Sequence, residues 1–367
     1  MDVVDHHTFL WLRRRTHARM GDTMKTGIKF FFLSLAFSAL FSCHRPKKIN
    51  VSFYYWKTVY KANKTEAGYL RYFKIHKLYV RIMDVNIVEE DTSPGPISPI
   101  IFKNKLPDSL QIIPVVFIVN DVFKNITKPQ LNDLTNKILH FVNGKVQQAG
   151  KASFTELQID CDWTAATRDN YFFLLRQLKL NPGLKHKILT ATLRLHQLKN
   201  QRGSGIPPVN RVMLMCYNMG NLRKYGNQNS ILEISELKKY LGDNITAYPI
   251  SVDIGLPLFS WAVAFRNKEY IGISKRIKIV DLNNKNQFIF IGNNIYKAAK
   301  DLPEFGLNKA DEVRWESVAV TDLQAAARYL SSLIKTDTVN VIYFHLDETV
   351  IKPYAFKDLE KVNNLLR

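Results

Sequence analysis

The stretch 156–164, Glu-Leu-Gln-Ile-Asp-Cys-Asp-Trp-Thr, decides the fold that this chain is expected to adopt. Its apolar residues predict a strand, and the residues that follow have the spacing of a helix. Because side chains alternate across a strand, Gln158, Asp160 and Asp162 share one face and the residues between them share the other. An apolar strand that runs straight into a helix is typical of the buried parallel sheet of an α/β protein.

The rest of the chain repeats this alternation of strand and helix. Strands are predicted at 51–60, 78–85, 112–120, 156–162, 188–196, 211–217, 248–254 and 339–346. About eight strands separated by helices predict an α/β fold of the (β/α)8 TIM-like barrel type. An open doubly wound sheet is the alternative, but no glycine-rich phosphate loop follows the first predicted strand. The alternation of strand and helix is interrupted at 258–335, which predicts an insertion between strands seven and eight.

The amino-terminal region predicts export. Residues 24–43 have a short basic start, an apolar run of signal-peptide length and the ending Leu-Phe-Ser-Cys, which resembles a bacterial lipobox with Cys43 as the lipidated residue. An ordinary signal peptide or a short anchor helix is the alternative. Residues 1–23 are interpreted as an upstream extension, 44–50 as a tether and 51–367 as a single barrel domain. We therefore expect a protein of the bacterial cell envelope, lipid-anchored at the outer membrane or on the periplasmic face.

The chain of 367 residues has a formal net charge of +20 and is 46% hydrophobic. This composition supports a large core and excludes a disordered chain. The basic residues are scattered, and no nucleic-acid-binding module is recognised, so we expect a basic surface, no nucleic-acid partner and a monomer.

No Cys/His spacing indicates zinc, and neither a metal nor another cofactor is expected. His196 and His345 together with Asp160 remain an alternative metal-binding set.

Two cysteines follow Cys43 in the sequence, Cys161 and Cys216. Each falls in a predicted strand on the side facing the helices. If one further strand lies between theirs, they are about 9–10 Å apart, which is beyond the reach of a disulfide. We expect two buried free thiols.

The alternation also predicts which side chains point into the barrel. Polar groups gather toward the carboxyl ends of the strands, where barrel active sites lie. The predicted inward set is Asp160, Asp162, Thr190, Thr192, Arg194, His196, Met213, Met215, Tyr217, Ser251, Asp253, Tyr343, His345 and Asp347. Asp84, at the end of the second predicted strand, is a further candidate, but its position in the alternation is ambiguous. A network of satisfied ion pairs, such as Arg194 with Asp160, is the alternative interpretation of these residues.

Two of these segments resemble family 18 glycosidases, the chitinase-like barrels. Residues 157–164 resemble the fourth-strand signature Asp-Gly-x-Asp-x-Asp-Trp-Glu, and 215–218, Met-Cys-Tyr-Asn, resemble the sixth-strand Met-x-Tyr-Asp. The whole chain is also similar to a family of bacterial lipoproteins with an uncharacterised barrel domain. Members of that family carry a comparable fourth strand and a Leu-Pro-x-Phe-x-Trp segment, which here is 256–261.

The resemblance implies that Asp160 and Asp162 form the catalytic centre and that Tyr217 helps to hold the substrate. The other expected substrate-binding residues come from the inward faces and the matched segments: Asn218, Asp253, Arg194, Trp261, Asp84, His345 and Asp347. The sequence departs from the pattern at the general acid, where Thr164 replaces glutamate. Thr164 is interpreted instead as the N-cap of the following helix. Leu157-Gln158 stands in place of Asp-Gly, and Asn218 in place of the sixth-strand aspartate.

Glycoside hydrolysis needs two carboxyl groups about 5–9.5 Å apart. Asp162 could pair with another acid from across the barrel, and the candidates are Asp253, Asp347, Glu348 and Glu316. Trp56, Trp163 and Trp261 are interpreted either as a sugar-stacking floor or as core residues. The sequence thus supports a barrel that cleaves a glycan or, because the expected glutamate is absent, one that binds a glycan or a protein without catalysis.

Overall fold

The computed structural model describes residues 46–87 and 93–367. Cys43, the predicted signal peptide and the predicted upstream extension lie outside these residues. The described chain from Lys47 to Arg367 forms one compact unit. Strand β1 (Lys48–Tyr55) begins inside the predicted tether 44–50. In the described ranges, every helix is too short or too polar to span a bilayer.

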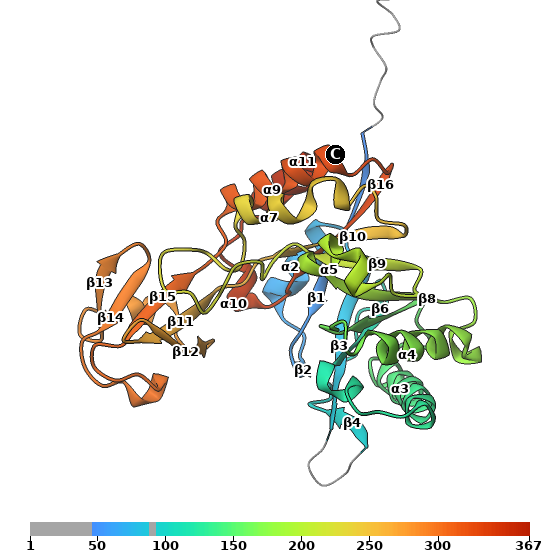
Figure 1. Ribbon diagram of the computed structural model, residues 1–367. Helices are drawn as coiled ribbons and strands as arrows, with labels where there is room; N and C mark the ends of the chain where they lie inside the picture. Colours follow the sequence, from blue (N-terminus) through green and yellow to red (C-terminus); the bar gives the residue numbers. More distant parts are fainter. Residues whose placement is uncertain (1–45, 88–92) are drawn as a thin grey trace, which may run out of the picture. The chain divides into compact units, whose positions relative to one another are not determined.

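Eight parallel strands close into a barrel, which confirms the predicted α/β barrel (Figure 1). Each strand pairs with the next in parallel register, and β1 pairs with β16 on one side and with β3 on the other. Because β1 has partners on both sides, the sheet has no open edge there, and an open doubly wound sheet is excluded. In order around the barrel, the strands are β1, β3 (Lys77–Ile87), β6 (Gln111–Ile118), β7 (Glu156–Asp160), β8 (Ile188–Arg194), β9 (Arg211–Met215), β10 (Ser251–Pro257) and β16 (Thr338–Phe344).

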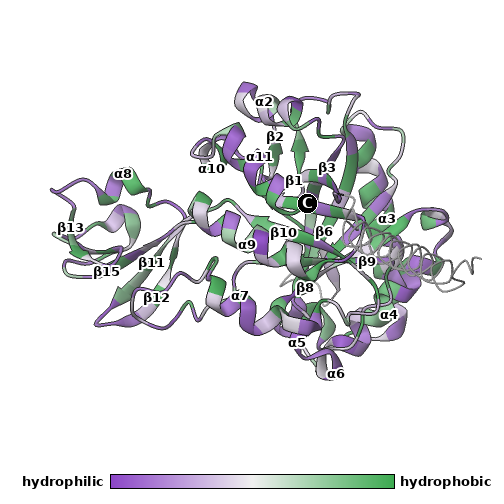
Figure 2. Cartoon of the chain, turned by 90° about the horizontal axis from the view of Figure 1, so that it is seen from above, coloured by the Kyte–Doolittle hydropathy of each residue, from purple (hydrophilic) through white to green (hydrophobic). Residues whose placement is uncertain are grey.

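Helices surround these strands (Figure 2). The longest, α3 (Lys128–Gln148), starts with a capping box of Thr127 and Gln130, as its sequence favours. Helix α4 (Arg168–Leu180) buries an apolar face that includes Tyr171 and Leu174. The remaining helices are α2 (Lys64–Tyr72), α5 (Leu195–Lys199), α6 (Gln201–Ser204), α7 (Ile234–Leu241), α9 (Val320–Leu333), α10 (Glu348–Ile351) and α11 (Phe356–Leu365).

Short strands extend this frame. Strand β4 (Pro94–Ile97) pairs antiparallel with β3, and β2 (Val59–Tyr60) pairs with β5 (Ile101–Phe102). Single turns of 3₁₀ helix complete the loops, and these are η1 (Asn120–Phe123), η2 (Pro182–Leu184), η3 (Gly242–Asn244) and η4 (Pro303–Phe305).

A second, five-stranded sheet follows β10 (Figure 2). It has its own small core, which includes Phe288 and Val313. Its strands, in spatial order, are β12 (Glu269–Ser274), β11 (Trp261–Arg266), β15 (Glu312–Glu316), β14 (Ile295–Ala298) and β13 (Phe288–Gly292), with α8 (Ile279–Leu282) between β12 and β13. Helix α9 lies within the predicted insertion 258–335 but packs against α7 and α11 of the barrel's helical layer. The sheet is therefore shorter than the predicted insertion.

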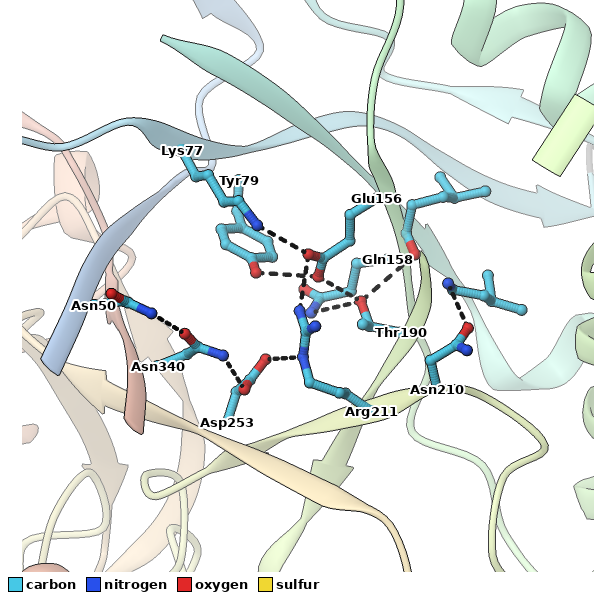
Figure 3. A network of polar contacts seen from close by, with 12 residues as sticks. Asn50, Lys77, Tyr79, Glu156, Gln158, Thr190, Asn210, Arg211, Asp253 and Asn340 are labelled. Carbon is cyan, nitrogen blue, oxygen red and sulfur yellow. Dashed lines mark hydrogen bonds and ion pairs between the residues drawn. The ribbon is translucent and has the colours of Figure 1, made fainter. Parts of the chain in front are cut away.

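Near the amino ends of the strands, the barrel interior holds a network of charges that we call the barrel floor: Lys77, Tyr79, Glu156, Arg211, Asp253 and Asn340 (Figure 3). Arg211 donates to Glu156 over 2.8 Å and to Asp253 over 2.9 Å. The Asn340 amide donates to the second oxygen of Asp253 over 2.7 Å. Asp253 is 3% exposed. It points inward as predicted, but it lies in the floor because β10 runs from Ser251 to Pro257 and not over the predicted 248–254, so that Asp253 is near its amino end.

Candidate functional site

At the carboxyl ends of the barrel strands, the structure has a cavity of about 610 Å³, which we call the barrel mouth. Side chains from most of the barrel strands and from the five-stranded sheet line it. The lining includes Tyr54, Trp56, Arg81, Asp84, Asp160, Asp162, Thr192, Arg194, Met213, Met215, Tyr217, Asn218, Phe259, Trp261, Lys275, Lys278, Phe344, His345 and Asp347. Of the expected catalytic and substrate-binding residues that the structure describes, Asp253 is the one that lies elsewhere. Two other residues that were predicted to point inward do not: Tyr343 faces the helical layer and donates to Asn363 of α11 over 2.8 Å, and His196 is exposed on α5 because β8 ends at Arg194. A polar cavity at this end of a barrel is a candidate binding site.

Asp160 and Asp162 end β7 on the face that the alternation predicted. Thr192 of β8 donates a 2.6 Å hydrogen bond to Asp160. Burial raises the pKa of Asp160 to about 7, and the neighbouring Asp162 charge acts in the same direction against the Thr192 hydrogen bond. Asp162 is half exposed and forms a 2.9 Å ion pair with Arg194, in place of the Arg194–Asp160 pair considered from the sequence. Asp160 is therefore protonated below about pH 7, whereas Asp162 is held in an ion pair with Arg194.

Arg81 and Asp84 form a second ion pair in the mouth, with Arg81 Nε 2.6 Å from Asp84 Oδ1 and a further bond from Nη2 to Oδ2. Three residues apart, they would face opposite ways on a regular strand. The register of β3 against β6 shifts between Arg81 and Met83, and this bulge brings both side chains to the interior. The bulge also explains why sequence alternation could not settle the direction of Asp84.

His345 and Asp347 follow β16 into the mouth. Burial lowers the pKa of His345 to about 4, so the imidazole is neutral at physiological pH. Its Nδ1 is buried and has no hydrogen-bond partner among the described residues. Asp347 caps α10 by accepting from the backbone N–H of Thr349. It also lies 3.6 Å from Lys57.

Tyr217 and Asn218 follow β9 and line the cavity as predicted. Asn218 has a φ of 56°, a left-handed conformation that asparagine tolerates better than most residues. Its backbone oxygen accepts a 3.3 Å hydrogen bond from Arg194. Its side-chain oxygen is buried without a partner among the described residues. This oxygen and His345 Nδ1 are the buried polar atoms of the mouth that are left for a ligand.

The three tryptophans considered from the sequence divide into two kinds. Trp56 and Trp261 line the mouth. Trp163 is 1% exposed, stacks on Tyr171 and donates to the Ser204 carbonyl, so it is a core residue and not part of a sugar-stacking floor. Trp261 is fixed by a 2.9 Å hydrogen bond from its Nε1 to Glu316.

Glu316 was a candidate for the missing acid, and its contacts exclude a direct role. It is 2% exposed. It accepts from the backbone N–H and hydroxyl of Ser230 and is paired with Arg314 over 2.7 Å. Glu316 therefore positions Trp261 and the loop after β9. Glu348, the other outlying candidate, bonds Asn63 and Thr65 outside the mouth.

Arg81, Lys275 and Lys278 are the charged lining residues that sequence reasoning missed. Arg81 could have been found by its three-residue spacing from Asp84 if a bulge had been assumed. The two lysines have no such signal, because they belong to the segment between β12 and α8 and reach the mouth through the tertiary fold. Thr164 is absent from the described lining, and α4 begins at Arg168, so Thr164 is not its N-cap.

Within residues 46–87 and 93–367, no cluster of three or more His, Cys, Asp or Glu side chains could hold a metal ion. Cys161 and Cys216 are free and buried, as predicted. Burial raises the pKa of both thiols well above the usual range, which makes them poor nucleophiles.

No known family profile and no curated protein matches this sequence. Solved structures do match. The SleL spore cortex-lytic enzyme of Bacillus cereus has a TM-score of 0.51 at 16% identity, with 86% of this chain and 75% of that chain covered. A chitinase of Chromobacterium violaceum has a TM-score of 0.51 at 10% identity, with 86% and 98% covered.

An Ostrinia furnacalis group IV chitinase, solved in complex with allosamidin, has a TM-score of 0.50 at 11% identity, with 86% of this chain and 98% of that chain covered. At such low identities the similarity shows a shared barrel fold. The structural neighbours of this chain thus include chitinases and cortex-lytic enzymes.

Proposed function

We propose that the barrel mouth binds a glycan and that the chain is a lipid-anchored protein of the bacterial envelope, related to the uncharacterised barrel lipoproteins that it resembles. The cavity carries this proposal. Carboxylates suit sugar hydroxyls as hydrogen-bond acceptors, and indole rings suit the apolar faces of sugar rings. Asp160, Asp162, Trp56 and Trp261 supply both kinds of group in one cavity of suitable volume. The chitinase solved with allosamidin supports the same class of ligand.

Glycoside hydrolysis is the second candidate function, and the unequal states of Asp160 and Asp162 favour it. A carboxyl whose pKa is near 7 can donate a proton to a leaving group. Asp162, held by Arg194, can stabilise positive charge or orient the substrate. In this proposal Asp160 takes the acid role that Thr164 cannot take.

A glycan array followed by calorimetry tests the binding proposal. Wild type is expected to bind at least one oligosaccharide, and Trp261→Ala is expected to weaken that binding by about two- to tenfold through lost stacking. Trp315→Ala is the matched control, because Trp315 is also half-buried but lies in the five-stranded sheet away from the described lining. An array without a single ligand, or equal losses in the two variants, contradicts the proposal.

Product analysis by mass spectrometry separates binding from cleavage. If the barrel is a hydrolase, wild type shortens the bound glycan, whereas Asp160→Asn binds it and releases no product, because an amide cannot act as the acid. If wild type binds the glycan without shortening it after prolonged incubation, the protein is a non-catalytic binder.

The anchor is tested by expression in a bacterium fed labelled palmitate. Wild type is expected to incorporate the label and to sediment with membranes. Cys43→Ser is expected to do neither, since lipidation needs the thiol. If the Cys43→Ser protein still incorporates labelled palmitate, this result contradicts the proposal.

A further inference from the structure

The charges that line the barrel mouth are mostly paired with one another. Asp162 is paired with Arg194, Asp84 with Arg81, and Asp347 with the nearby Lys57. Asp160 accepts from Thr192, and burial raises its pKa to about 7, so that it carries only part of a negative charge near pH 7. The anionic side of the cavity therefore has little charge left for a ligand.

Lys275 and Lys278 are different. Both are exposed, both line the cavity, and neither has an ion-pair partner within the part of the chain that the structure describes. The charge of Lys275 reaches the buried His345, where it helps to lower the pKa of that imidazole. The cavity thus holds an unneutralised cation together with a buried nitrogen, His345 Nδ1, that has no hydrogen-bond partner among the described residues.

The segment that carries these lysines is held in place. Ile277, between them, is 1% exposed and packs into the core of the five-stranded sheet. The Ile277 backbone N–H donates to the Ser274 hydroxyl over 3.2 Å, and that of Lys278 donates to Asp281 over 2.8 Å. Lys275 and Lys278 lie on either side of this buried anchor in the chain, and both are exposed and line the mouth. Their position follows from packing and is not that of a free surface loop.

We infer that Lys275 and Lys278 form a cationic subsite of the barrel mouth and that the glycan it takes carries acidic groups. The inference rests on the proposed function and adds the charge of the ligand to it. A carboxylate or a sulfate on a sugar would meet the two ammonium groups at one side of the cavity. The sugar rings would meet Trp56 and Trp261. A neutral glycan would leave the lysines solvated and make no use of them.

The test compares sugars that differ only in charge. The probes are a galacturonic acid tetramer and its methyl ester, a disaccharide repeat of N-acetylglucosamine and N-acetylmuramic acid and its methyl ester, and a sulfated chitotetraose with its unsulfated parent. Calorimetry at several salt concentrations gives the affinity of each. The wild type is expected to prefer one acidic member over its neutral partner by about fivefold or more, and this preference is expected to fall as salt rises.

The lysine variants show where the preference arises. Lys275→Ala and Lys278→Ala are each expected to weaken binding of the acidic probe by about two- to fivefold, the usual effect of one exposed ion pair, and to leave the neutral probe unchanged. Lys275→Arg should retain the preference. Lys285→Ala is the matched control, because Lys285 is exposed in the turn between α8 and β13 and does not line the mouth. Unchanged melting temperatures show that the variants fold.

Three outcomes overturn the inference. The first is equal affinity for charged and neutral partners, and the second is a preference for the neutral one. The third is a preference for acid that survives in the double variant Lys275→Ala/Lys278→Ala. The pair of probes that shows the preference distinguishes carboxylate from sulfate. If no probe of either charge binds and the wider array is also blank, the proposed function fails and the inference fails with it.

Discussion

The barrel floor and the barrel mouth are built from the same kinds of charged residue at opposite ends of the same strands, and they treat charge differently. In the floor, Arg211 bonds two acids that are each almost fully buried, and Asn340 and Tyr79 occupy further acceptor sites (Figure 3). In the mouth, Arg194 bonds a half-exposed Asp162 at the edge of a cavity. Buried charges must satisfy one another, whereas charges at a cavity can satisfy a ligand.

This difference indicates which ion pairs support the fold and which are available for function. Breaking a buried pair leaves a charge with no water to solvate it, and this is strongly destabilising. Breaking a pair at the mouth leaves a charge that water can reach. The two ends should therefore respond differently to the same substitution.

The largest expected effect is that of Arg211→Met. It leaves the buried Asp253 without a cationic partner and Glu156 with only Lys77 at 3.8 Å, and it is expected to lower the free energy of unfolding by about 3–5 kcal/mol. The same change at the mouth, Arg194→Met, should cost about 1 kcal/mol or less, because Asp162 is half exposed. Urea denaturation monitored by tryptophan fluorescence measures both. Equal losses in the two variants would remove the distinction between floor and mouth.

Gly255 of β10 lies between the floor residue Asp253 and the mouth residue Tyr217. A Cβ added there would lie 2.5 Å from Met213 Sδ and 3.2 Å from both the Leu214 oxygen and Tyr217 Cε1. Gly255→Ala is therefore expected to destabilise the barrel by about 1–3 kcal/mol through overpacking and to displace Tyr217.

Gly144→Ala is the matched control for Gly255→Ala. A Cβ at Gly144 in α3 would meet nothing within 4 Å, and a helical alanine is expected to stabilise by about 0.5–1 kcal/mol. The two changes should thus move the denaturation midpoint in opposite directions. A shift of the same sign in both would show that the β10 backbone can adjust around the added methyl group.

A pH-dependent effect is expected at Asp160. Folding raises its pKa from an ordinary 3.8 to about 7, so the folded state binds this proton more tightly than the unfolded state does. Its contribution to stability is complete below about pH 4 and is lost as pH rises through 7. Asp160→Asn removes this dependence and should therefore gain stability relative to wild type, on the order of 2 kcal/mol between pH 5 and pH 8.

Denaturation curves of wild type and Asp160→Asn at several pH values measure this difference. Asp169→Asn is a suitable control, because Asp169 is exposed on α4 and its removal should not change the pH profile in this way. A constant difference between wild type and Asp160→Asn across this range would mean that Asp160 is ionised throughout, like other surface carboxylates.

Much of the barrel could be predicted from local patterns. Strand β7 was predicted from an apolar run with two-residue alternation, and helix α4 from its helical spacing of apolar residues. Both are present in the structure, because burial of their apolar faces stabilises them. The inward directions of Asp160, Asp162, Arg194 and Tyr217 follow from the same alternation. The prediction was incomplete for Asp84, because a bulge in β3 changes the alternation without a signal in the sequence.

By itself, the sequence determined the inward direction of most strand residues, since alternation depends only on neighbouring residues. It was wrong for Tyr343, which faces α11, and for His196, which lies on α5 beyond the end of β8. It could not determine where each strand begins in the folded barrel. Strand β10 begins three residues later than predicted, which places Asp253 in the floor, whereas Asp160 ends β7 and lies in the mouth. The tertiary structure also brought Lys275 and Lys278 to the cavity. The buried Ile277 between them anchors their segment to a separate sheet, and no pattern near them encodes the barrel.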